Sequence, residues 1–255
     1  MEATLSPSLA PRTAGNENTR LLKLVALVFM ITDHVGVVFF PGQLIFRLFG
    51  RIAFPLYAWC LVVGVEYTKN IYRYALRLLI GLVISQPCFV LALGENWDTL
   101  NIFASLLLGL FAIYGIRENR YGSAWIFPII AIFLTLLIRI DYDWRGVALM
   151  IVLYAARKNR GALAAAFVSF CLFWGTNTVS VASLLHIPSS ISFLPAAYTL
   201  LNAVSRIQFY AVLALPFLLI PMNKCRVRLP RFVAYALYPA HLLIIWVVQT
   251  YLMGA

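Results

Sequence analysis

Asp33 and His34 are adjacent polar residues inside VFMITDHVGVVFF, a stretch of helical length that is otherwise almost entirely apolar. An imidazole exchanges protons near neutral pH, so a histidine can act as a general base or a nucleophile in group transfer. A neighbouring carboxylate can hold a cation and so organise the site. If the stretch lies in a membrane, each charge costs at least about 2.5–3.5 kcal/mol, which makes the pair a candidate functional site.

The next apolar stretch, IFRLFGRIAFPLY, offers partners for the aspartate. It places Arg47 and Arg51 four residues apart on one helical face, and the intervening Gly50 permits close approach of another helix. Consecutive helix positions point about 100° apart, so Asp33 and His34 should not face each other. We predict an ion pair of Asp33 with Arg47 or Arg51 that leaves His34 free to titrate. A purely structural pair that fixes helix register is the alternative.

Two further sets of polar residues accompany apolar runs. Arg73 and Arg77 are again four residues apart, and two guanidinium groups on one helical face suit the binding of phosphates. Ordinary anchoring of basic side chains at a membrane edge is the alternative. The last run contains YALYPAHLLII, in which Pro239 kinks the helix between Tyr238 and His241. A histidine there is either a satisfied core donor or part of the site.

Other polar residues predict no second centre. Asp141 and Asp143, beside Arg139 and Arg145, are expected to form a solvated loop on the outer side. The four cysteines have neither metal-ligand nor disulfide spacing, and we expect them to be small core residues. No bound metal is expected.

The composition is that of a membrane protein. Hydrophobic residues make up 63% and charged residues 11% of the 255 residues, and the mean hydropathy is +0.89. A soluble domain is about half apolar and a quarter charged. Apolar runs of about 17–25 residues, the length that crosses a hydrocarbon core, recur from residue 21 to the end. The sequence therefore predicts an all-α, polytopic transmembrane helical bundle.

The basic residues set the predicted topology. Most of the lysines and arginines behind the net charge of +11 lie in short clusters between apolar runs, so the charge indicates membrane orientation and not binding of nucleic acid. The positive-inside rule places these clusters, and the amino terminus, in the cytoplasm. His34 then lies about 21 Å along its helix from Arg20, past the midplane towards the outside. The clusters are Arg12/Arg20/Lys23, Lys69/Arg73, Arg117/Arg120, Arg157/Lys158/Arg160 and Lys224/Arg226/Arg228/Arg231.

About nine crossings satisfy this arrangement, with roughly eight to eleven left open around residues 186–206. Residues 1–19 are polar and contain two prolines, so we expect a disordered cytoplasmic segment followed by one membrane domain, residues 20–255. The predicted spans are 21–40, 45–66, 74–94, 99–116, 122–139, 144–156, 161–185, 206–222 and 232–253.

Three stretches of the sequence resemble one family. ALVFMITDHVGVVFF, then GRIAFPLYAWCLVVGVEYTKNIYRYALRLL, and finally YALYPAHLLII are similar to the opening and closing helices of the TraX family. Its named member is the N-acetyltransferase of conjugative pilin. The family in turn resembles the wider transmembrane acyltransferases, in which a first-helix histidine is implicated in acyl transfer and basic residues at the cytoplasmic mouth hold coenzyme A.

The resemblance implies an acetyl-CoA-dependent N- or O-acetyltransferase in a bacterial inner membrane. His34 becomes the catalytic group and Asp33 its helper, with direct transfer and an acetyl-histidine intermediate both left open. Acetyl-CoA would be the donor and no metal is implied. The acceptor, a pilin-like amino terminus or a glycan, would enter from the outer side, and a homodimer is left open. The remaining residues that the resemblance implicates are Arg73, Arg77, Arg51 and Arg47 for the donor, and His241 and Tyr238 for the acceptor.

Two other functions compete with this one. A proton-coupled transporter could use Asp33, His34 and Arg51 as a relay, because intramembrane histidine and aspartate suit that role equally well. A non-catalytic membrane scaffold would use the same charges only to hold helices together. The absence of a visible internal repeat disfavours a transporter built from two related halves.

Overall fold

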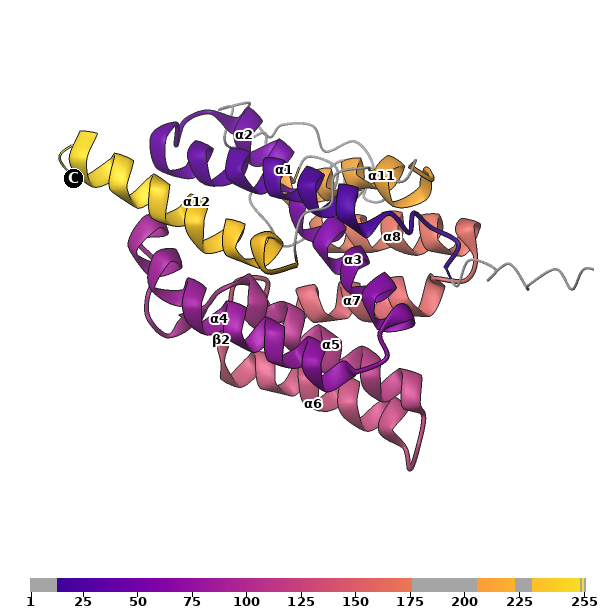
Figure 1. Cartoon of the computed structure of the whole chain (residues 1–255). Coiled ribbons are helices and arrows are strands. Elements are labelled where there is room, and N and C mark those ends of the chain that lie inside the picture. Colours follow the sequence, from indigo (N-terminus) through magenta and orange to yellow (C-terminus); the bar gives the residue numbers. More distant parts are fainter. Residues whose placement is uncertain (1–12, 176–205, 223–230, 253, 255) are drawn as a thin grey trace, which may run out of the picture.

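The computed structural model describes residues 13–175, 206–222, 231–252 and 254. These residues form helices that lie side by side in one bundle, as Figure 1 shows. The predicted all-α class is confirmed, and three apolar segments, 19–39, 44–67 and 71–93, are long enough to cross a membrane. The number of crossings and the orientation of the amino terminus stay predictions.

Where the structure describes the predicted spans, the helices follow them closely, with one break; residues 176–185 of the span predicted at 161–185, and the stretch 186–205 after it, lie outside the described residues. The span predicted at 45–66 divides at Arg51 and Ile52, whose amides donate to the carbonyls of Arg47 and Phe49 in a tight turn. The elements are α1 (Thr19–Phe39), α2 (Leu44–Gly50), α3 (Ala53–Tyr67), α4 (Ile71–Leu93), β1 (Thr99–Leu100), α5 (Ile102–Glu118), α6 (Ser123–Leu137), β2 (Arg139–Ile140), α7 (Asp143–Ala156), α8 (Arg160–Gly175), the 3-10 helix η1 (Ile207–Ala214), α11 (Leu215–Leu219) and α12 (Arg231–Leu252).

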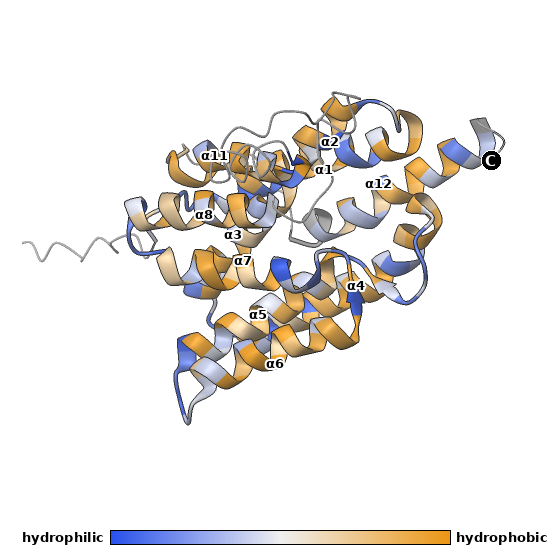
Figure 2. Cartoon of the chain, turned by 180° about the vertical axis from the view of Figure 1, so that it is seen from behind, coloured by the Kyte–Doolittle hydropathy of each residue, from blue (hydrophilic) through white to orange (hydrophobic). Residues whose placement is uncertain are grey.

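Helix α3 lies at the centre of the bundle. In the segment 44–67, 72% of the most apolar window is buried, against 22% for α1 and 28% for α4. The exposed faces are apolar instead, as the orange colouring of α4 and α6 in Figure 2 shows. On α6, Trp125, Ile129 and Leu136 are each at least 65% exposed. Such faces are disfavoured in water and suited to lipid, because lipid accepts apolar side chains on the outside of a helical bundle.

The basic loops gather at one end of the bundle. The turns after α3, α5 and α7 and the start of α1 all lie on the right side of the bundle in Figure 1. Arg117 donates to the carbonyl of Val65 at 2.8 Å, and Arg157 forms an ion pair with Glu66. The amide of Ala14 donates to the carbonyl of Arg157 at 2.7 Å. Ends of helices that are distant in sequence are therefore tied together at one end of the bundle. The cluster at residues 224–228 lies outside the described residues.

Residues 13–18 are packed against the bundle, which differs from the expectation of disorder over residues 1–19. Asn16 is 1% exposed. Its amide donates to the carbonyl of Leu218 at 2.6 Å, and its side chain donates to the carbonyl of Phe217 at 3.0 Å. The indole of Trp59 in α3 donates to the Asn16 carbonyl at 2.7 Å. Polar side chains thus satisfy backbone groups of segments distant in sequence, and the composition of residues 1–19 could not reveal such pairing. Residues 1–12 lie outside the described residues.

Replacing Trp59 with phenylalanine should lower the free energy of unfolding by about 1–3 kcal/mol. The change leaves the buried Asn16 carbonyl without the indole N–H that it accepts, and such an orphaned acceptor carries a desolvation penalty of that size. Thermal unfolding of the purified protein measures the loss. Trp97→Phe is the matched control because Trp97 is 65% exposed. Equal melting temperatures for the two variants would contradict the proposed anchoring.

Two short strands were not predicted. Strand β1 pairs in parallel with β2, with Thr99 opposite Arg139 and Leu100 opposite Ile140. The backbone ladder continues one residue further, because the amide of Asp141 donates to the carbonyl of Leu100 at 3.0 Å. The connection between α4 and α5 is therefore fixed to the connection between α6 and α7.

Candidate active site

The predicted ion pair of Asp33 is confirmed, and both arginines take part. Arg51 donates from Nη2 to both carboxylate oxygens of Asp33, at 2.9 and 3.1 Å, while Arg47 lies at 3.5 Å. Both members of the closer pair are largely buried, with side chains 14% and 12% exposed. A buried carboxylate needs such a partner, and the two-point contact fixes α1 against the turn between α2 and α3.

Gly50 allows this contact to form. A Cβ atom at position 50 would lie 2.3 Å from three atoms of the Asp33 side chain. Real Cβ atoms do not approach that closely, so any other residue would push α2 away from α1. The glycine between the two arginines is thus required by the close approach of the carboxylate, as the sequence pattern suggested.

Gln208 is a further member of the cluster that the sequence did not indicate. Its Oε1 accepts from Arg51 Nη1 at 3.2 Å, and Arg51 Nε donates to the carbonyl of Arg47 at 3.3 Å. All three nitrogen atoms of the Arg51 guanidinium thus donate hydrogen bonds within the protein. The only signal in the sequence was a glutamine inside the otherwise apolar run that forms η1. In the structure Gln208 is 5% exposed.

His34 points away from Asp33 and contacts α12. Its Nδ1 lies 2.8 Å from Nε2 of His241, and the two rings are nearly parallel, at 8°. His241 Nδ1 lies 3.0 Å from the carbonyl of Leu237. A carbonyl only accepts, so His241 Nδ1 must carry a proton, and its Nε2 is then the acceptor in the neutral ring. His34 Nδ1 is therefore the donor, which leaves a lone pair on His34 Nε2.

This arrangement prepares His34 for proton transfer. In a neutral histidine, the hydrogen bond made by one ring nitrogen decides whether the other nitrogen carries a proton. The chain Leu237 carbonyl, His241, His34 thus orients the ring and assigns the base to Nε2. Pro239 sits within the same turn of α12 and breaks the regular hydrogen-bonding pattern there.

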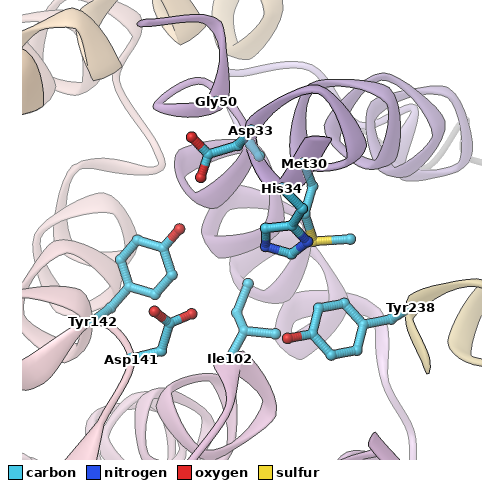
Figure 3. A pocket seen from close by; sticks show the side chains of 9 residues that line it. Met30, Asp33, His34, Gly50, Ile102, Asp141, Tyr142 and Tyr238 are labelled. Atoms are coloured by element: carbon cyan, nitrogen blue, oxygen red, sulfur yellow. The ribbon is translucent and has the colours of Figure 1, made fainter. Parts of the chain in front are cut away.

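His34 borders a small pocket between α1, α5, α12 and the connection before α7 (Figure 3). The pocket brings together the predicted residues Asp33, His34 and Tyr238. His241 lies behind His34, and its ring is 5.5 Å from that of Tyr238. The lining residues are Met30, Asp33, His34, Gly50, Ala53, Ile102, Asp141, Tyr142 and Tyr238.

Asp141 is exposed, as expected for a solvated loop, but it also faces the pocket beside His34, which the sequence did not predict. It lines the pocket, whereas its neighbours do form surface pairs, Arg139 with Asp98 and Arg145 with Asp143. The ladder between β1 and β2 directs Asp141 towards the pocket, and no local pattern in the sequence distinguishes it from the acidic and basic residues beside it.

Comparison with known proteins now places the chain. The family model described as TraX protein matches residues 18–249, nearly the whole chain. The chain belongs to the TraX family. The match includes every residue that lines the pocket, and His241 behind it.

One curated relative of this TraX-family chain is an uncharacterized protein, RP591, of Rickettsia prowazekii (strain Madrid E). The two are 29% identical over 145 residues, which are 55% of this chain and 56% of the relative. The chain thus spans about half the length of the curated relative that it matches. No solved structure matches the chain.

Arg73 and Arg77 lie apart from the pocket. They are in the first turns of α4, at the end of the bundle that holds the basic loops (Figure 1). Arg73 is exposed, and the Arg77 guanidinium lies over the ring of Tyr74 at 5.5 Å. Asn70 caps the helix by accepting from the amide of Arg73 at 2.9 Å. The two arginines are thus presented on an ordered helix start, and their role as phosphate ligands remains a prediction.

Proposed function

We propose that the protein is an integral membrane acyltransferase that moves an acetyl group from cytoplasmic acetyl-CoA to an amine or hydroxyl acceptor at the outer side. The observation that carries the proposal is the lone pair on His34 Nε2, oriented by His241 at 2.8 Å and bordering the pocket. Membership of the TraX family supports it, because the family's named member transfers acetyl groups.

In the proposed reaction, His34 Nε2 takes the proton of the acceptor while the acceptor's nitrogen or oxygen bonds to the acetyl carbon. A positioned base of this kind contributes typically 10²–10⁴-fold to a rate. Charge that develops on His34 is shared through its Nδ1–H with His241. Asp33 does not touch His34 in this scheme. It positions the histidine by fixing α1 to Arg51.

Basic residues at the other end of the bundle suit the donor. Arg73 and Arg77 carry planar guanidinium groups, which bind phosphates in a fixed geometry. In the predicted topology this end faces the cytoplasm, where acetyl-CoA is available. We therefore assign the phosphates of the donor to these arginines and the reacting carbonyl to the pocket.

The geometry favours a transferase over the transporter alternative. A relay through Asp33, His34 and Arg51 would need the three groups in one hydrogen-bonded chain. Both oxygens of Asp33 accept from Arg51, and His34 bonds instead to His241 on another helix. The ion pair and the histidine pair are therefore separate units with separate tasks.

Acetyl-CoA should raise the melting temperature of the detergent-purified protein more than ATP does at equal concentration. A ligand at 100 times its Kd stabilises the native state by about 2.7 kcal/mol, because it binds only the folded protein. Arg73→Gln with Arg77→Gln should abolish the extra shift. Arg139→Gln, a change of an exposed arginine in a surface pair, should leave it intact. Equal shifts with acetyl-CoA and ATP would contradict a donor site.

A further inference from the structure

Asp141 occupies the pocket wall across from the histidine pair. In Figure 3 the Asp141 carboxyl group, the His34 ring and the Tyr238 hydroxyl point into one space around Ile102. Asp141 belongs to none of the helices, since it follows β2 and precedes α7. Its side chain is accessible from the pocket.

The position of Asp141 is set by hydrogen bonds to the backbone of β1 and of the residues beside it. Its amide donates to the carbonyl of Leu100, and β1 is held in turn by Gln86 of α4. Gln86 Nε2 donates to the carbonyl of Thr99 at 2.7 Å, and Gln86 Oε1 accepts from the amide of Asn101 at 3.1 Å. Asn101 Nδ2 donates to the carbonyl of Leu82 at 3.0 Å. Gln86 and the buried Asn101 thus hold β1, and through it the backbone of Asp141, in one place.

The surroundings leave the Asp141 carboxyl available for chemistry. Among the side chains that the structure describes, in residues 13–175, 206–222 and 235–251, it has neither an ion pair nor a side-chain hydrogen bond, whereas Asp33 is paired with Arg51. The depth of the site within the protein raises the pKa of Asp141 to about 7. The charged and titratable groups that act on Asp141 or border the pocket with it are Arg47, Arg51, Asp33, Glu95, His34, Tyr142 and Tyr238.

We propose that Asp141 is the second proton-transfer group of the site, a carboxylic acid that donates its proton to the departing thiolate. This role rests on the proposed acyl transfer. It complements His34, because one group removes a proton from the acceptor and the other supplies one to the leaving group. Two titratable groups held in different environments are the usual arrangement for such a division of tasks.

The step balances as follows. The acceptor's nitrogen or oxygen bonds to the acetyl carbon, and its proton passes to His34 Nε2. The bond between the acetyl carbon and the coenzyme A sulfur breaks, and the Asp141 O–H proton passes to that sulfur. Products are the acetylated acceptor and the free thiol, with His34 protonated and Asp141 ionised. Transfer of one proton from His34 to Asp141 restores both groups.

The test compares wild type, Asp141→Asn and Asp141→Glu, with Asp98→Asn as the matched control at the exposed pair with Arg139. Thiol release from acetyl-CoA is measured with a peptide bearing a free amino terminus and with glucosamine as acceptor probes. Asp141→Asn should lower the faster of these rates by about 100-fold, Asp141→Glu should restore part of it, and Asp98→Asn should leave it unchanged. The acetyl-CoA thermal shift should stay the same in all four proteins.

A second readout needs no activity. A carboxyl group with a raised pKa in the folded protein destabilises the native state as pH rises between about 4, its unfolded value, and 7. The melting temperature of wild type relative to Asp141→Asn should therefore fall by several degrees from pH 5 to pH 8. The difference between wild type and Asp98→Asn should stay flat over the same range.

The two readouts separate the claims. Suppose that wild type is active, but that its melting temperature relative to Asp141→Asn does not change with pH, or that Asp141→Asn turns over normally. Either result would overturn the role of Asp141 and leave the transferase standing. A wild type that releases no thiol with either probe, while the pH-dependent difference persists, would overturn the transferase and the role of Asp141 within it. Loss of activity in Asp141→Asn together with the pH-dependent difference is the result expected.

Discussion

His34→Ala is expected to lower the rate of acetyl transfer by about 10²–10⁴-fold while the protein still folds and still responds to acetyl-CoA in a thermal shift. The reason is that the variant removes the only base assigned to the acceptor proton, which typically contributes a factor of that size. His34 is only partly buried, so its loss leaves no large core cavity. Turnover is measured as thiol release by the purified protein.

Two further variants define the origin of this loss. His241→Ala removes the acceptor for His34 Nδ1–H and frees the ring to adopt the other tautomer, so the rate should fall by about 10–100-fold, the range found when a group that orients another is lost. Thr32→Ala is the control on α1, since its hydroxyl only donates to the carbonyl of Val28 within the helix. Full activity in His34→Ala would exclude the histidine from the reaction, whatever His241→Ala does.

Asp33→Ala should lower the free energy of unfolding by about 3–5 kcal/mol, the largest effect on stability expected for a single change in the site. The variant leaves Arg51, with a side chain only 14% exposed, without its carboxylate, and an uncompensated buried charge has a penalty of that size. Gln208 and the Arg47 carbonyl still accept from Arg51, but neither carries a negative charge. Reversible denaturation in mixed micelles measures the change.

A double-mutant cycle separates this penalty from general damage. Asp33→Ala with Arg51→Met should regain much of the lost stability, because the buried Arg51 charge is gone and the arginine that still lacks the carboxylate, Arg47, is 38% exposed. Asp98→Asn is the surface comparison: its pair with Arg139 has side chains 58% and 73% exposed, and such pairs contribute about 0–1 kcal/mol. A double variant as unstable as the sum of its two single variants would show that the charges do not act as a pair.

Much of the fold could be predicted because hydropathy and charge act locally. Spans such as 21–40 and 74–94 correspond to α1 and α4, since a helix that crosses lipid must be continuously apolar over about 20 residues. The break after Gly50 was not predicted, because a turn of only two residues leaves no gap in the hydropathy of the segment. Strands β1 and β2 were missed for a different reason: two residues leave no periodic pattern, and β1 is held by Gln86 of the preceding helix α4 and by Asn101, which directly follows the strand.

The site was predictable only where its parts are near in sequence. An ion pair of Asp33 with Arg47 or Arg51 could be predicted because both arginines lie on one face of the next apolar stretch, within 18 residues of the aspartate. The contact of His34 with His241 spans 207 residues, so that only folding brings the two rings together. Asp141 was assigned to a solvated loop because charged neighbours surround it. Only the direction of its backbone, set by β1, turns it into the pocket.

The most direct test of the central claim is transfer of radiolabel from [acetyl-14C]coenzyme A into membranes from cells that produce the protein, because this detects an acceptor of any chemistry. The proposed mechanism predicts label in membrane material that depends on the wild-type chain and falls to background with His34→Ala. Immunoblots would confirm equal amounts of the two proteins, and Thr32→Ala should label like wild type. Equal incorporation with wild type and His34→Ala, or none with either, would contradict acetyl transfer at this pocket.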